Sequence, residues 1–246
     1  MALLKKPNLV LGLATGNTPI GLYDELARMH NAEGLDFSQV VTFNLDEYVG
    51  IPANHPESYH TFMERHLFSK LNIPASNRYI PQSTTDNLEE FCEWYEERIR
   101  YFGGIDIQSL GIGTNGHIGF NEPSSSLGSR TRLKTLAPAT IQAHVPNFGG
   151  DAEAVPKMAI TMGIGTIMEA KRCLLLANGK SKADAIARCV EGPITAEVPA
   201  SALQMHPRVI ILIDEAAASH LKRIDYYKWA YENKLRLERQ VKTGSG

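Results

Sequence analysis

Cysteine is scarce in this chain. Three cysteines occur among 246 residues, at Cys92, Cys173 and Cys189, and no two of them form a C-x-x-C pair. An odd number at wide spacing argues against a disulfide framework and against a thiolate metal site. Proteins of a reducing compartment use cysteine in this way, so we expect a cytoplasmic location.

An excess of positive charge is also missing. The formal net charge is -2, and charged residues make up 21% of the chain. Because no basic surface is available to neutralise phosphates, we expect no nucleic-acid partner. No apolar run reaches membrane-spanning length, and the first one stops at Thr15-Gly16 without the cleavage pattern of a signal peptide. The expected partner is therefore a small molecule, with no membrane involved.

Internal repeats and low-complexity blocks are absent as well. A chain of this length can bury a large core as one α/β domain, so we expect a single domain over residues 1–246. Only the end, 242–246 (KTGSG), has the composition of a disordered tail.

Short apolar runs are present, and they end repeatedly in glycine or in acidic residues. They lie at 9–16, 40–48, 107–113, 158–165, 173–179 and 209–214. Their continuous hydrophobicity predicts strands that are covered on both faces. Helical patterns lie between them, at 19–32, 58–70, 87–102, 180–191 and about 215–238. This alternation predicts an α/β fold with a mainly parallel, Rossmann-like sheet between two layers of helices, a three-layer α/β/α sandwich.

The loop after the first predicted strand has the form of a phosphate cradle. It reads Ala14-Thr15-Gly16-Asn17-Thr18-Pro19. Small residues let backbone N–H groups approach an anion, the two threonine hydroxyls can donate, and the following helix end adds partial positive charge. In open sheets of this kind, ligands bind at the carboxyl ends of the strands. The alternative is a strand-to-helix turn without a ligand.

The second predicted strand ends in two adjacent carboxylates, Asp46 and Glu47. Neighbouring side chains of an extended segment point to opposite sides, so one carboxylate can face a cleft while the other faces the protein. Either of them is a candidate base. The alternative is that both are solvated acids of a loop.

The third predicted strand leads into a glycine-rich loop, residues 111–123. Residues 111–116 match G-x-G-x-x-G, but the dinucleotide fingerprint requires a helix at once and an acid where Leu136 stands. We reject that interpretation. The loop instead presents His117 between Asn115 and Glu122. An imidazole with a carboxylate partner can transfer protons near neutral pH.

A metal site and a covalent nucleophile are not expected. The spacings of His55, His60 and His66 do not place the imidazoles on one helical face. No G-x-S-x-G elbow occurs, and each cysteine lies within a helix or strand pattern.

Five motifs in one order, LATGNTP, FNLDEYVG, HPESYH, GTNGHIGFNEP and SRTRLKTL, resemble the glucosamine-6-phosphate deaminase family, also called glucosamine-6-phosphate isomerase. The resemblance covers the core from about residue 8 to 235. It implies the fold shared with 6-phosphogluconolactonases, and conversion of glucosamine 6-phosphate plus water into fructose 6-phosphate and ammonia without metal or organic cofactor. On this basis we expect an enzyme of amino-sugar catabolism, of the hydrolase class.

The resemblance also implies roles for the candidate residues. Asp46 matches the carboxylate that moves a proton from C2 to C1 of the sugar. His117 matches the acid and base that opens the ring, and Glu122 is its carboxylate partner. Asn115 stands where many members carry Asp and others Asn, so the relay here contains one carboxylate instead of two.

The substrate-binding residues implied by the resemblance are Thr15, Gly16, Asn17, Thr18, Tyr59, Gly113 and Lys182. One departure lies in 139–150, where the family lid carries a phosphate-binding arginine. Here that place reads Val145-Pro146-Asn147-Phe148, so this contact is missing or rerouted. Members also carry a longer segment before the first strand, which would leave part of one sheet face uncovered here.

A second anion site is implied by Ser125, Arg132 and Lys134, which resemble the site where hexameric members bind N-acetylglucosamine 6-phosphate as activator. The alternative is an exposed basic loop. The long C-terminal helical pattern favours a homo-oligomer, with a hexamer as one candidate form. Two other functions stay open on the same residues: a 6-phosphogluconolactonase-like hydrolase, and a sugar-phosphate sensor without catalytic activity.

Overall fold

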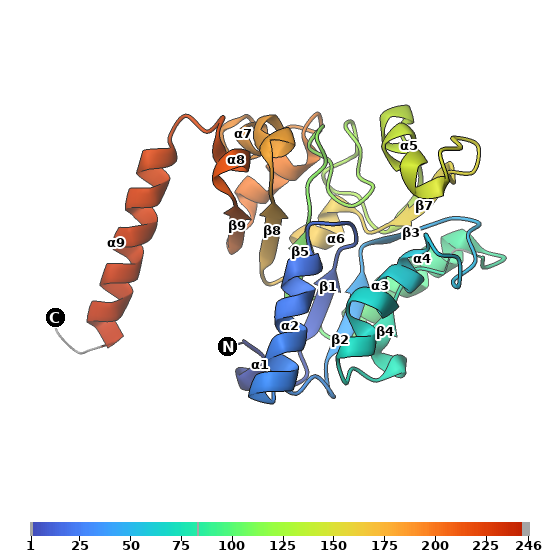
Figure 1. Ribbon diagram of the computed structural model, residues 1–246, viewed down its shortest axis with the longest axis horizontal. Coiled ribbons are helices and arrows are strands. Elements are labelled where there is room, and N and C mark those ends of the chain that lie inside the picture. The colour runs from blue at the N-terminus through green and yellow to red at the C-terminus, as the bar shows by residue number, and fades with distance from the viewer. Residues whose placement is uncertain (1, 83, 243–246) are drawn as a thin grey trace.

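A six-stranded parallel sheet forms the centre of the protein. The computed structural model describes residues 2–82 and 84–242 (Figure 1). The sheet consists of β1 (Val10–Leu13), β2 (Val41–Asn44), β4 (Arg78–Tyr79), β5 (Ile107–Leu110), β8 (Cys173–Ala177) and β9 (Val209–Ile213). Their order is β4-β2-β1-β5-β8-β9, and every neighbouring pair is parallel. The predicted tail lies outside the described residues beyond Lys242.

Helices connect the strands. They are α1 (Ala2–Lys5), α2 (Ile20–Glu33), α3 (Tyr59–His66), α4 (Leu88–Tyr101), α5 (Pro138–His144), α6 (Ile164–Met168), α7 (Ala183–Glu191), α8 (Glu215–Ala218) and α9 (Ile224–Lys242). Asn87 begins α4 because its side chain accepts a hydrogen bond from the Glu90 N–H. Short 3-10 turns occur at Phe68–Lys70, Ala75–Asn77, Val145–Phe148, Lys180–Lys182 and Pro199–Met205.

Residues in β1 and directly before it pack alternately against opposite helical layers. Leu9 and Leu13 belong to the core that includes Tyr23 of α2 and residues of α3. Val10 belongs to the core that includes residues of α4. Because side chains alternate along a strand, both faces of this strand are buried. The predicted α/β sandwich with a mainly parallel sheet is confirmed.

A second, three-stranded sheet was not predicted. The apolar run at 40–48 divides at Leu45 into β2 and β3 (Asp46–Tyr48), and β3 pairs antiparallel with β7 (Met158–Thr161), which pairs with β6 (Arg132–Thr135). Leu45 joins the sheets, since its N–H donates to the Leu13 carbonyl and its carbonyl accepts from the Met162 N–H. The expectation that 158–165 belongs to the parallel sheet is wrong, because burial alone does not reveal which sheet a strand enters.

The β9 edge also departs from the prediction. Ile210 and Leu212 are 56% and 62% exposed, so the outer face of β9 is not covered. The helix predicted over 215–238 breaks after α8, and α9 stands off from the rest of the molecule (Figure 1). None of the helices within the described residues combines the length and apolarity needed to cross a bilayer.

The strand order reverses between β1 and β5. From β1 the chain adds strands toward β4, and from β5 it adds them toward β9. The connections after β1 and β5 therefore diverge at the carboxyl ends of these strands, which is where open α/β sheets bind ligands.

Candidate active site

A cavity of about 660 Å³ opens at this point of divergence. Most of the residues predicted from the sequence line it: Thr15, Gly16, Asn17, Thr18, Asp46, Tyr59, Gly113, His117 and Lys182. They come from the loops after β1 and β5, from β3, from α3 and from the turn before α7. The structure thus brings together segments that are far apart in the sequence.

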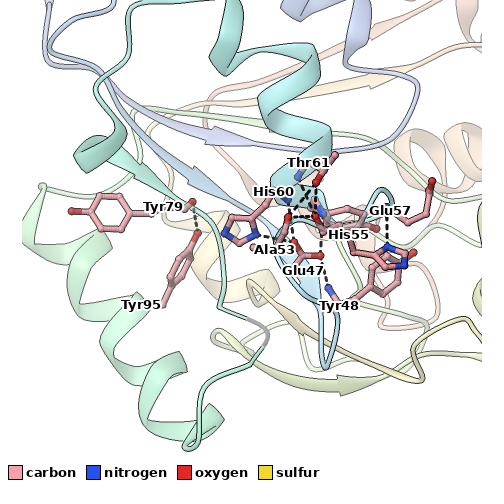
Figure 2. Close-up of polar contacts among 11 residues, drawn as sticks. Glu47, Tyr48, Ala53, His55, Glu57, His60, Thr61, Tyr79 and Tyr95 are labelled. Carbon is pink, nitrogen blue, oxygen red and sulfur yellow. Dashed lines mark hydrogen bonds and ion pairs between the residues drawn. The ribbon is translucent and has the colours of Figure 1, made fainter.

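Asp46 and Glu47 point to different places, as the strand alternation predicts. Glu47 is fully buried and accepts hydrogen bonds from the N–H groups of Tyr59 and His60, both at 3.1 Å, so its carboxylate sits at the start of α3 (Figure 2). It also contacts Nδ1 of His60 at 3.1 Å. Asp46 lines the cavity. Of the two candidate bases, Asp46 is therefore the one that a ligand can reach.

Burial changes the proton affinity of Asp46. Its side chain is 6% exposed, and desolvation together with the neighbouring charge of Glu47 raises its pKa to about 8. Gly119 leaves space beside it: with φ +56, a Cβ there would lie 3.3 Å from Asp46 Oδ2. A carboxyl group with this pKa can both take and return a proton near neutral pH.

Asn115 fixes the tautomer of His117. Asn115 Nδ2 donates to Glu122 Oε2 at 2.8 Å, so the amide nitrogen faces the carboxylate. Asn115 Oδ1 then lies 2.7 Å from His117 Nδ1 and can only accept. The Nδ1 atom therefore carries the proton in neutral His117, which leaves Nε2 as the base.

Glu122 lies behind this pair and stays ionised. Its Oε2 is 3.6 Å from His117 Nδ1, and Thr140 of α5 donates a short hydrogen bond to Oε1. Desolvation raises the pKa of Glu122, but the hydrogen bonds from His117, Thr140 and Asn115 outweigh it and bring the pKa to about 2. The carboxylate of Glu122 therefore keeps a negative charge close to the imidazole of His117.

Gly113 has a steric role that sequence reasoning missed. A Cβ at this position would lie 2.1 Å from Cε1 of His117, so only glycine leaves room for the imidazole ring. The resemblance implied substrate binding, and Gly113 does line the cavity. A glycine in a glycine-rich loop gives no signal of the ring that packs on it.

The loop after β1 is held from both sides. Tyr23 of α2 donates its hydroxyl to the Ala14 carbonyl, and Thr18 Oγ1 lies 3.5 Å from Oδ1 of Asn178, which follows β8. Among the described residues, no side chain caps the start of α2. Lys182 is a cation in the lining of the same cavity, and burial lowers its pKa. Asn178 was not predicted, because its position beside Thr18 depends on the sheet order.

The segment α5 to Phe148 forms one side of the cavity through Ala143, His144 and Asn147. It is fastened by the Thr140 contact and by a 2.5 Å hydrogen bond between the Tyr48 hydroxyl and His144 Nδ1. Residues 145–148 form a 3-10 turn with Pro146 inside it. As the sequence indicates, this segment brings no arginine to the cavity.

The three residues of the possible activator site lie outside the cavity lining. Ser125 is 2% exposed and its hydroxyl has no hydrogen-bond partner within the described residues. Arg132 donates to Asn121 Oδ1 at 2.9 Å, and burial lowers its pKa. Lys134 follows on the same strand, β6.

The histidines weighed as metal ligands have separate contacts. His55 accepts from the Glu57 N–H, His60 contacts Glu47, and His66 packs on Phe62. Over residues 2–82 and 84–242, no three or more His, Cys, Asp or Glu side chains gather as they would around a metal ion.

A buried carboxylate and a histidine relay at the switch point of a parallel α/β sheet define an enzyme that moves protons on a small molecule. Residues 1–211 match the family described as glucosamine-6-phosphate isomerases/6-phosphogluconolactonase. The chain belongs to this family.

Its relatives support one branch of the family. The chain is 52% identical over 233 residues to the glucosamine-6-phosphate deaminase of Hahella chejuensis, covering 95% of this chain and 88% of the relative. It is 52% identical over 222 residues to glucosamine-6-phosphate deaminase 2 of Bacillus subtilis, covering 90% and 89%.

A comparison with solved structures also supports the deaminase branch. A monomeric glucosamine-6-phosphate deaminase superposes with a TM-score of 0.85 at 49% identity, covering 88% of this chain and 89% of that one. The 6-phosphogluconolactonase of Trypanosoma brucei superposes with a TM-score of 0.70 at 19% identity, covering 88% of each chain. The second likeness shows the shared fold alone.

One expectation is wrong, namely that the enzyme is a hydrolase. The relatives are named deaminases, and the family name describes isomerases. Those names describe isomerase-type removal of an amino group, for which a proton-transferring carboxylate is suited, and not hydrolysis of a scissile bond.

Proposed function

We propose that this chain converts glucosamine 6-phosphate and water into fructose 6-phosphate and ammonia in amino-sugar catabolism. The observation that carries the proposal is that Asp46 and His117 line one cavity, with Asn115 and Glu122 hydrogen-bonded behind the imidazole. The relatives, about half identical to this chain over most of their length, bear the name of this activity.

The relay is suited to opening the sugar ring. Nε2 of His117 is the unprotonated nitrogen, so it can accept the proton of the sugar hydroxyl. The imidazolium that forms faces the ionised Glu122, which stabilises it. His117 then returns the proton to the ring oxygen.

Asp46 is suited to the next step. As a carboxylate it takes the proton from C2 and delivers it to C1, which converts the aldose into a ketose-level imine; water then adds at C2 and ammonia leaves. Its pKa of about 8 lets it hold the proton between the two transfers. The Thr15 to Thr18 loop and Lys182 would bind the 6-phosphate through backbone N–H groups, hydroxyls and a cation.

The test is to replace Asp46 by Asn. We expect loss of ammonia and fructose 6-phosphate formation and loss of exchange of the C2 proton with solvent, with binding of glucosamine 6-phosphate retained. Asp86→Asn, at an exposed position before α4, is the matched control and should behave as the native chain. The proposal fails if the native chain binds the sugar phosphate but releases no ammonia.

The alternatives are less supported. A lactonase would not require the buried carboxylate Asp46 for proton transfer between carbons, and its likeness is one of fold. A silent sensor would not require an oriented relay. Hydrolysis of 6-phosphogluconolactone by the native chain would favour the first alternative.

The activator site is a further part of the proposal. An unpartnered buried hydroxyl at Ser125 and the cations Arg132 and Lys134 support binding of N-acetylglucosamine 6-phosphate. Arg132→Gln should abolish activation by this sugar phosphate and leave the basal rate within about twofold. An unchanged activation curve would favour the basic-loop alternative.

We also propose that copies of the chain associate as a homo-oligomer, with a hexamer as one candidate form, although one related deaminase is monomeric. The bare outer face of β9 and the exposed aromatic residues of α9 support this. The proposed location is the cytoplasm, supported by three free, buried cysteines. Sedimentation and cell fractionation test these two points.

A further inference from the structure

One side of α3 faces the cavity along the length of the helix. The lining residues of this segment follow the three- and four-residue spacing of one helical face: Ser58, Tyr59, Phe62, Arg65 and His66. Tyr59 lies at one end of the cavity, where its ring is 5.1 Å from that of Tyr48. We call this the aromatic end. Arg65 and His66 lie in the last turn, at the opposite end of the helix.

This last turn lies beside the start of α2. Lys70, just beyond α3, donates to Asp24 Oδ1 at 2.8 Å, and Asp24 also acts on the pKa of His66. The two helices run side by side (Figure 1). The Thr15 to Thr18 loop lies directly before α2, and we call the part of the cavity that it lines the phosphate end. Arg65, beside the start of α2, therefore lies at the phosphate end.

The cations of this end have no carboxylate partner in the part of the chain that the structure describes. No hydrogen bond or ion pair holds the side chain of Arg65 or of Lys182 there. Of the described residues that line the cavity, only Asp46 and Glu57 are acids, and both come from the aromatic end. Burial, then Lys70 and Arg65, lowers the pKa of His66, as an excess of positive charge requires.

The wall formed by α5 and the turn after it supplies no compensating cation among the residues that the structure describes. Its lining residues are Ala143, His144 and Asn147, and burial and His117 lower the pKa of His144. We propose that Arg65 is a phosphate-positioning and specificity-determining residue, which binds the 6-phosphate of the substrate together with Lys182. A planar guanidinium matches two phosphate oxygens at once. The identity of the sugar in this inference rests on the proposed function. Binding of a phosphate group by Arg65 does not.

The test compares three variants of the full chain. Arg65→Gln should raise KM for glucosamine 6-phosphate about tenfold or more and leave kcat within about threefold, because a charge-assisted hydrogen bond is lost. Arg65→Lys should restore part of the affinity. Arg172→Gln, an exposed arginine at the amino end of β8, away from the strand ends where the cavity opens, is the matched control and should leave both constants unchanged.

Binding of inorganic phosphate separates this inference from the proposed function, because it needs no turnover. Phosphate should raise the pKa of His66, followed by NMR, in the native chain and in Arg172→Gln but far less in Arg65→Gln. Equal phosphate affinity in Arg65→Gln and the native chain would overturn the inference, as would an equal loss of affinity for glucosamine without phosphate. If the phosphate effect holds but no fructose 6-phosphate forms, the proposed function fails and the inference stands.

Discussion

Asn115 holds the position in the relay that decides how strongly His117 binds a proton. Its amide oxygen accepts from Nδ1 but brings no formal charge, so Glu122 is the single carboxylate of the relay. In Asn115→Asp a second carboxylate would stabilise the imidazolium that forms during ring opening. We therefore expect the pH optimum of ring opening to move upwards. An unchanged pH profile would contradict this, and Asn31→Asp, at an exposed position of α2 away from the cavity lining, serves as control.

Asp46 predicts a second pH dependence. A base must be ionised, and burial with the charge of Glu47 raises the pKa of Asp46 to about 8. Below that pH the carboxyl group is protonated, so kcat/KM for deamination should rise as the pH rises through about 8. The measurement is initial ammonia release across this range at low substrate. A profile that is flat there, or that falls, would argue against Asp46 as the base.

The sequence predicts which residues reach the site but not what holds them. Asp46, His117 and Lys182 end or follow predicted strands, and the ends of parallel strands meet at one edge. Thr140 and Asn178 carry no local signal, because their contacts depend on a lid and a sheet order that only long-range packing determines.

At the scale of elements, the start of helix α3 depends on the buried carboxylate of Glu47, which belongs to strand β3. Glu47 accepts from the first N–H groups of this helix, which have no partner within the helix. Glu47→Gln should lower the free energy of unfolding by about 1–3 kcal/mol, because charged hydrogen bonds in a buried place are lost. The measurement is urea denaturation.

Glu64→Gln is the matched control for this prediction. Glu64 lies on the exposed side of α3 and pairs with Arg78 at the surface. Its replacement should change the free energy of unfolding by less than about 0.5 kcal/mol. Equal effects of the two substitutions would show that Glu47 does not stabilise the helix start.

Elements were predicted best where apolar runs and helical patterns alternate regularly along the chain. β1, β5 and β8 are found within the runs that indicated them, and α2 and α4 differ from prediction by a residue at their ends. The runs at 40–48 and 158–165 misled, since a buried apolar run looks the same in either sheet. The two-residue strand β4 is too short to leave a pattern.

At the scale of the whole molecule, α9 is the element least explained by the chain's own packing. Tyr226 and Trp229 stack on each other at 6.2 Å yet are 58% and 61% exposed. Exposed aromatic surface of this kind is a feature of interfaces. None of the residues that line the cavity comes from α9.

If α9 joins copies of the chain, its surface controls assembly but not catalysis. Trp229→Glu should convert an oligomer into a monomer in sedimentation and leave kcat within about twofold, because burying a charge in an interface is costly. Lys228→Glu, an exposed neighbour on the polar side, is the control and should sediment as the native chain does. A native chain that sediments as a monomer at micromolar concentration would refute the association. A Trp229→Glu oligomer would instead place the interface on the other bare apolar surface, the outer face of β9, where Leu212→Glu is the corresponding substitution.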